Sequence, residues 1–249
     1  MCADQEIDWP LDCLHRRSFL TTSSVITAMA LMGIGTFGNI ARADALTKAK
    51  RDKLSPNDIL ELMRKGNKRF YTGKREDYNF LRQQRATAKG QYPAAILLTC
   101  IDSRAPAETI LDLRIGDIFN SRVAGNVANS DILGSMEFAC KLAGAKVVLV
   151  MGHTACGAIK GAIDNAELGN LTGLLAKIKP AVAATTFSGE RSSKNYAFVD
   201  AVARKNVEIT MTNIRKDSPV LAEMESNGAI KIAGAMYNLE TGVVDFFAG

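Results

Sequence analysis

Three short apolar runs separated by helix-like segments restrict this chain most strongly to one class of fold. They lie within residues 94–99, 115–123 and 146–152. Such runs are typical of strands that helices cover on both faces, as in a parallel sheet. Two more strands, 230–239 and 243–248, are expected to pair through a hairpin-type turn. The sequence therefore predicts an α/β fold with a central, mostly parallel β-sheet flanked by helices.

Helix signals fill the remaining segments. Ser55 is a plausible N-cap, and Pro56 occupies the first helical position. Residues 71–93 are polar and basic and are expected to form a loose arm. We therefore divide the chain after the N-terminal segment into a helical arm, residues 44–93, and an α/β domain, residues 94–249. Further helices are expected around residues 130–143, 171–184, 197–216 and 219–227.

Residues 1–43 have the features of a twin-arginine-type signal peptide. Arg16 and Arg17 precede an uncharged stretch, and an A-x-A site ends at Ala43. An uncleaved membrane anchor is the alternative, since the stretch approaches the roughly 20 residues that span a bilayer. Its dilution by Thr, Ser and Gly favours the cleaved signal. We therefore expect an exported, periplasmic protein with no stable membrane anchor after cleavage.

The cysteines and histidines are few, and cleavage would leave fewer. The chain contains five cysteines and two histidines. Cleavage after Ala43 would leave Cys100, Cys140, Cys156 and a single histidine, His153. Three cysteines cannot all form disulfides in an oxidising compartment, so at least one needs another explanation. Cys140 lies in a helical stretch and is interpreted as a buried thiol.

The charge of the chain excludes one class of partner. The formal net charge is +5, and the basic residues are spread along the sequence. Nucleic-acid binding favours clustered basic residues with interleaved aromatic side chains. Such clusters are absent from the sequence, so no nucleic-acid partner is expected.

The residues that follow two of the apolar runs indicate a metal site. Cys100 and His153 come directly after these runs. The carboxyl ends of parallel strands meet at one edge of a sheet, so these two side chains are expected to lie close together. Cys156 is three residues after His153, and a turn of that length can present both side chains to one point. Zinc binds thiolate and imidazole, and catalytic zinc sites use three protein ligands.

Asp102 and Arg104 add a second element to this site. Asp102 can accept a hydrogen bond from zinc-bound hydroxide, and Arg104 can hold its carboxylate with a fork of N–H donors. A closed structural zinc site and a core position for a lone cysteine remain alternatives. A zinc nucleobase deaminase is excluded, because the H-x-E and P-C-x-x-C motifs are absent.

Three motifs resemble those of the β-class carbonic anhydrases in their order and spacing. They are CIDSR (residues 100–104), GDIFNSRVAGN (116–126) and VVLVMGHTACGA (147–158). The resemblance extends from about Ser55 to Gly249. It implies a β-carbonic-anhydrase-like fold with an N-terminal helical arm, assembled as a homodimer or homotetramer.

The same resemblance implies roles for individual residues. One Zn²⁺ per chain would be bound by the two cysteines and the histidine, with Asp102 and Arg104 as the catalytic pair. In a closed state Asp102 would become the fourth zinc ligand. Gly125, Asn126 and Gly157 would line the substrate pocket. The tryptophan-containing bicarbonate pocket of some members is not expected, since the single tryptophan lies in the signal segment.

The function predicted from the sequence is the reversible hydration of CO2 to bicarbonate and a proton through zinc-bound hydroxide. Two alternatives remain open. One is a carbonyl sulfide or carbon disulfide hydrolase on the same scaffold, and the other is a non-catalytic bicarbonate-binding zinc protein. No second histidine is available to carry the proton away, so water and external buffer are the expected route.

Overall fold

The computed structural model describes residues 45–248, and the predicted signal peptide, residues 1–43, lies outside them. The strands are β1 (Ala95–Thr99), β2 (Ile118–Arg122), β3 (Val147–His153), β4 (Lys231–Tyr237) and β5 (Val244–Ala248). The α-helices are α1 (Lys48–Asp52), α2 (Pro56–Tyr71), α3 (Phe80–Thr87), α4 (Ala107–Ile110), α5 (Ser130–Glu137), α6 (Gly157–Ile163), α7 (Gly169–Ala176), α8 (Lys179–Ala184), α9 (Tyr196–Asp217) and α10 (Pro219–Ser226). A 3-10 turn, η1 (Ala124–Asn126), and a π-helical turn, η2 (Phe138–Leu142), complete the described elements. Within the described residues, no helix combines the length and the apolar character needed to cross a membrane.

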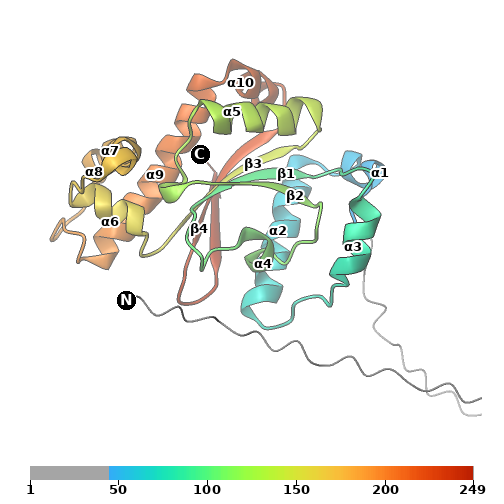
Figure 1. Ribbon diagram of the computed structural model, residues 1–249, viewed down its shortest axis with the longest axis horizontal. Helices are drawn as coiled ribbons and strands as arrows, with labels where there is room; N and C mark the ends of the chain where they lie inside the picture. Colours follow the sequence, from blue (N-terminus) through green and yellow to red (C-terminus); the bar gives the residue numbers. More distant parts are fainter. Residues whose placement is uncertain (1–44, 249) are drawn as a thin grey trace, which may run out of the picture. The chain divides into compact units, whose positions relative to one another are not determined.

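The five strands form one sheet in the order β2-β1-β3-β4-β5 (Figure 1). Strand β1 pairs in parallel with β2 and β3, and β3 pairs in parallel with β4. The last strand, β5, runs antiparallel to β4. The predicted mostly parallel sheet and its C-terminal hairpin are therefore confirmed.

Each face of the sheet is covered by its own apolar core, because successive strand residues point to opposite faces. Ile96 and Leu98 of β1 pack in the core that contains the buried residues of α9. Ala95 and Leu97 pack in the other core, with Ile59 of α2. Figure 1 shows α2 and α4 on one side of the sheet and α5, α9 and α10 on the other. Coverage of both faces explains why the central strands β1 and β3 are buried at every position and have mainly apolar sequences.

Most of the predicted helices are confirmed, and two of the predicted segments are divided. The segment 130–143 forms α5 and then η2, while α9 and α10 correspond to the last two predicted helices. The segment 171–184 is divided into α7 and α8, and Pro180 lies in the first turn of α8. Proline has no N–H to donate to a preceding turn, so a helix ends before it and a new one starts. Ser55 caps α2 as predicted, accepting from the Asp58 backbone N–H at 3.1 Å.

The prediction of a loose arm over residues 71–93 is wrong for its middle part, which forms α3. The Asn79 side chain caps this helix by accepting from the Arg82 backbone N–H at 2.9 Å. Gln83 is fully buried, and its side-chain oxygen accepts from the Ile115 backbone N–H at 3.1 Å. A polar residue therefore makes the buried contact of this helix, and a search for apolar periodicity does not detect it.

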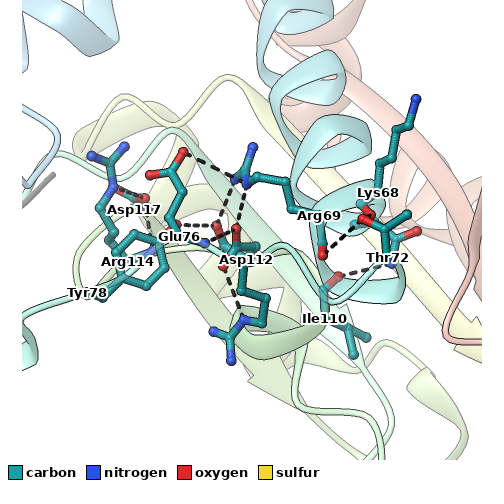
Figure 2. Close-up of polar contacts among 11 residues, drawn as sticks. Lys68, Arg69, Thr72, Glu76, Tyr78, Ile110, Asp112, Arg114 and Asp117 are labelled. Carbon is teal, nitrogen blue, oxygen red and sulfur yellow. Dashed lines mark hydrogen bonds and ion pairs between the residues drawn. The ribbon is translucent and has the colours of Figure 1, made fainter. Parts of the chain in front are cut away.

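Asp112, in the turn after α4, connects the N-terminal helices to the sheet domain (Figure 2). Its fully buried carboxylate accepts from Arg69 Nε at 2.6 Å, Arg75 Nε at 3.2 Å and the Glu76 backbone N–H at 3.2 Å. The Tyr78 hydroxyl donates to the Asp112 carbonyl at 2.8 Å. Burial, with the negative charge of Asp112, raises the pKa of Tyr78 to about 12. A buried network of charges, in addition to apolar packing, therefore fixes the arm.

Candidate metal centre

Two neighbouring strands deliver the first two predicted ligands to the same edge of the sheet. β1 and β3 are in parallel register, with Thr99 opposite Met151. Cys100 follows β1 directly, and His153 is the last residue of β3. Because both strands run in the same direction, their side chains meet beyond the carboxyl ends of the sheet.

A tight turn supplies the third ligand. Ala155 has a left-handed backbone with φ 55°, and Cys156 then occupies the N-cap position of α6. One ligand atom each from Cys100, His153 and Cys156 lies within 4.8 Å of the others. All three residues are buried, and neither cysteine forms a disulfide within the described part of the chain. The structure therefore brings the three predicted ligands together.

The imidazole of His153 is oriented for metal binding through Nε2. Its Nδ1 lies 2.9 Å from the Thr154 carbonyl, which can only accept, so Nδ1 carries the proton. Nε2 is buried and has no hydrogen-bond partner among the described residues. A buried nitrogen lone pair without a donor is costly unless a ligand occupies it. This arrangement of ring nitrogens is the one that metal-binding histidines use.

The two thiols have opposite pKa shifts. The pKa of Cys100 is lowered to about 4, chiefly because the Cys156 thiol donates to its sulfur, with further support from the Gly125 N–H. The same hydrogen bond, together with burial, raises the pKa of Cys156. Cys140 lies in η2, and burial raises its pKa to about 12, which agrees with its interpretation as a buried thiol. The donor set of two soft sulfurs and one imidazole nitrogen suits zinc.

Asp102 and Arg104 form a bidentate ion pair beside these ligands. Arg104 Nε donates to Asp102 Oδ1 at 3.0 Å, and Nη2 donates to Oδ2 at 2.8 Å. These hydrogen bonds lower the pKa of Asp102 to about 2. Asp102 Oδ2 lies 3.8 Å from His153 Nε2, so the carboxylate is next to the ligands while its oxygens are bound by arginine. Ligation of a metal by Asp102 in a closed state stays a prediction.

The residues expected to line the pocket lie around the same point. The Gly125 N–H donates to Cys100 Sγ at 3.4 Å. Asn126 is buried, has a left-handed φ of 44°, and its Nδ2 has no partner within residues 45–248. Gly157 is exposed at the start of α6. Arg122 donates to the Cys100 carbonyl at 2.9 Å and to the Asp102 carbonyl at 2.6 Å, which fixes the loop after β1.

Sequence reasoning missed two residues of α9 that contact the site. Asp200 accepts from the Ala155 backbone N–H at 2.8 Å, and Asn206 donates to the Gly125 carbonyl at 2.8 Å. Burial raises the pKa of Asp200. Both lie far along the chain from the three motifs, and no motif contains them. Nothing in the sequence of the predicted helix 197–216 distinguishes them from other polar residues of that helix.

Comparison with known proteins identifies the family. The carbonic anhydrase family profile matches residues 95–244. "Carbonic anhydrase 2" of Mycobacterium tuberculosis is 32% identical over 190 residues, which cover 76% of this chain and 91% of that protein. A "Carbonic anhydrase" of Mycolicibacterium smegmatis is 29% identical, over 77% of this chain and 93% of that protein.

Solved structures agree with the sequence comparison. The β-carbonic anhydrase CafA of Aspergillus fumigatus matches with a TM-score of 0.58 and 30% identity, over 66% of this chain and 79% of that one. A β-carbonic anhydrase from the structures of two tetrameric enzymes of Sordaria macrospora matches with a TM-score of 0.57 and 25% identity. The match covers 65% of this chain and 84% of that one. The α/β fold, the grouped cysteine and histidine ligands and these matches lead to one conclusion. The chain belongs to the carbonic anhydrase family of enzymes, in its β-class.

Proposed function

We propose that this chain is a zinc-dependent enzyme that hydrates CO2 reversibly to bicarbonate and a proton. The observation that carries the proposal is the Nε2 of His153, which has no hydrogen-bond partner among residues 45–248 and converges with the thiols of Cys100 and Cys156. Beside it, Arg104 keeps Asp102 away from direct ligation. Three ligands with a fourth position free is the arrangement of a catalytic zinc site.

Cys100, His153 and Cys156 would hold one Zn²⁺ per chain. When bound, the ion lowers the pKa of water, so that a nucleophile for CO2 is available near neutral pH. Asp102 stays ionised at any physiological pH, because Arg104 stabilises its charge. Its carboxylate accepts a hydrogen bond from the attacking water and orients it toward CO2. Arg104 fixes the direction of that carboxylate, and the loop of Gly125 and Asn126 lines one side of the pocket.

We further propose that the protein is exported and works as a homo-oligomer. The twin-arginine-type segment supports export to the periplasm, and the tetrameric relatives from Sordaria macrospora support assembly. Replacing Arg16 and Arg17 by lysines should retain the protein in the cytoplasm, and normal export would contradict the twin-arginine route. Light scattering on the purified protein should give a dimer or tetramer, and a monomer would contradict assembly.

The decisive test of substrate and metal uses one zinc-loaded sample. X-ray absorption at the zinc edge should give two sulfur ligands, one imidazole nitrogen and one further light ligand. The same sample should turn over CO2 faster than carbonyl sulfide or carbon disulfide. Faster turnover of the sulfur substrates would contradict the proposed substrate. Four protein ligands at every pH, with no turnover, would favour a structural zinc protein instead.

A further inference from the structure

Helix α9 packs beside the metal centre. It packs on β3 at Gly152, the residue before His153. A Cβ at Gly152 would lie 2.9 Å from Val207 Cγ2 of α9 and 2.9 Å from Met236 Sδ. A side chain at position 152 would force these two neighbours to shift, so the glycine lets α9 lie near the end of β3. From this position two of its polar side chains reach the turns that carry the ligands.

The first contact supports the turn between His153 and Cys156. Ala155 has φ 55°, a left-handed conformation that its Cβ makes unfavourable. The Asp200 carboxylate accepts from the Ala155 N–H at 2.8 Å, which offsets that penalty. The neighbouring Thr154 N–H donates to the Tyr237 carbonyl at 3.0 Å, so the start of the turn is also tied to β4. Without the Asp200 contact, the strained residue would lose its specific support.

The second contact supports the other side of the centre. Asn206 is 1% exposed, and its amide donates to the Gly125 carbonyl at 2.8 Å. Gly125 has φ 69°, and its N–H donates to Cys100 Sγ at 3.4 Å. Asn206 therefore holds Gly125 through its carbonyl, and the N–H of the same residue stabilises the negative charge of the Cys100 sulfur.

We propose that Asp200 and Asn206 are positioning residues that hold the two left-handed turns of the metal centre and thereby set how tightly it retains zinc. This inference rests on the proposed zinc function. Partners of this kind, one step removed from the metal, keep ligands in the geometry the ion requires before it binds. Here both partners come from one helix, so α9 would act on the histidine and on both cysteines together.

The test for Asp200 is zinc affinity, measured by competition with a chromogenic chelator. Asp200→Ala should weaken zinc binding by about 10- to 100-fold. The zinc affinity of Asp200→Asn should stay close to that of the unsubstituted protein, because the asparagine amide oxygen still accepts from the Ala155 N–H. Ala155→Gly placed in the Asp200→Ala background should recover much of the affinity, since glycine adopts a left-handed φ without support. A purely structural defect of α9 would not be recovered by that second change.

The test for Asn206 is the absorption spectrum of the Co²⁺-substituted protein. Asn206→Leu keeps the branched shape of the side chain and removes its donor, so the Gly125 N–H should lose its alignment with Cys100 Sγ. The thiolate-to-cobalt charge-transfer band should then move to longer wavelength, because the sulfur becomes a better electron donor. Glu208→Ala is the matched control on α9; Glu208 pairs with Lys205 and Arg204, and its loss should change neither zinc affinity nor the spectrum.

The results separate this inference from the proposed function. Unchanged zinc affinity in Asp200→Ala together with an unshifted band in Asn206→Leu would overturn the positioning roles, even with a fully active parent enzyme. Loss of affinity that Ala155→Gly leaves unrecovered would overturn the role given to Asp200. Failure of the unsubstituted protein to bind zinc would overturn the proposed function and this inference together.

Discussion

At the scale of single residues, Arg104 determines how the Asp102 carboxylate is presented to the metal centre. Both carboxylate oxygens are bound by one planar guanidinium, and the Arg104 backbone N–H adds a third donor to Oδ1 at 2.9 Å. A lysine ammonium carries the same charge but cannot make this fork. The geometry of the pair, as well as its charge, should therefore matter for catalysis.

We predict that Arg104→Ala lowers kcat/KM for CO2 hydration by about 10- to 100-fold. Arg104→Lys should give an intermediate value. Thermal unfolding of both variants should be nearly unchanged, because the Arg104 side chain is 60% exposed. Arg204→Ala, which removes an exposed ion pair with Asp245, is the control and should keep full activity. Equal activity in Arg104→Ala and the unsubstituted protein would remove Arg104 from the catalytic pair.

Gly125 is the position where the smallest change should have a large structural effect. Its φ is 69°, and an added Cβ would lie 2.6 Å from Ile178 Cδ1 and 3.3 Å from Ala158 Cβ. Gly125→Ala should therefore lower the free energy of unfolding by about 1–3 kcal/mol, measured by urea denaturation of the metal-free protein. Gly173→Ala is the control, since a Cβ there meets no described atom within 4 Å. Equal stability of both variants would contradict the need for glycine at position 125.

The ligands could be predicted from the sequence because their chemistry is rare and local. Cys100 and His153 each follow an apolar run, Cys156 comes three residues after His153, and this pattern is visible without coordinates. The tautomer of His153 could not be predicted, because it depends on where the Thr154 carbonyl points. The supporting residues Asp200 and Asn206 could not be predicted either. Their roles arise only when α9 packs beside β3, far away in the sequence.

At the scale of elements, the joint at Asp112 links α2 and the segment after it to the turn after α4 (Figure 2). Tyr78 belongs to this joint through its hydrogen bond to the Asp112 carbonyl, and its pKa is raised to about 12 from an ordinary value of 10. A raised pKa means that folding favours the protonated phenol. Its stabilising effect is complete below pH 10 and is lost as the pH rises from 10 to 12.

We therefore predict an alkaline loss of stability that depends on Tyr78. The unsubstituted protein should be more stable than Tyr78→Phe at neutral pH, and the difference should shrink between pH 10 and 12. Urea denaturation of both proteins across this range measures the difference. If the difference in the free energy of unfolding between the two proteins stays constant from pH 10 to 12, the ionisation of Tyr78 is not linked to folding.

Helix α3 shows which elements the sequence left undetected. The segments that form α2 and α9 were recognised as helices, and the buried faces of both consist mainly of apolar residues. The buried residue of α3 is Gln83, and its contact is a hydrogen bond to the Ile115 backbone. Asn79 was a readable cap signal, but the charged residues around it favoured a solvated segment.

At the scale of the whole molecule, the sheet order explains why a metal centre can form from distant parts of the chain. The parallel neighbours β1 and β3 end at the same edge, and the η1 turn after β2 lies beside them. The sheet class was predictable, since buried parallel strands need apolar residues at every position. The order of the strands in the sheet could not be predicted, because it depends on how the strands and helices pack together.

Proton removal is expected to depend on the solvent. His153 is the one histidine after the predicted signal segment, and both of its ring nitrogens are committed, Nδ1 to the Thr154 carbonyl and Nε2 to the metal position. It cannot therefore carry the proton out. The turnover number at low buffer should rise with the concentration of a small buffer such as imidazole. A turnover number independent of buffer would require a proton carrier elsewhere in the protein.

Zinc-dependent CO2 hydration is best tested by stopped-flow measurement of hydration while the metal-free protein is titrated with zinc. Hydration should rise in proportion to added zinc and reach its plateau at one zinc per chain. Cys156→Ser should reduce both zinc retention and hydration. If the protein binds one zinc per chain but hydrates no CO2 at any pH where it stays folded, it is not a zinc-dependent enzyme of CO2 hydration.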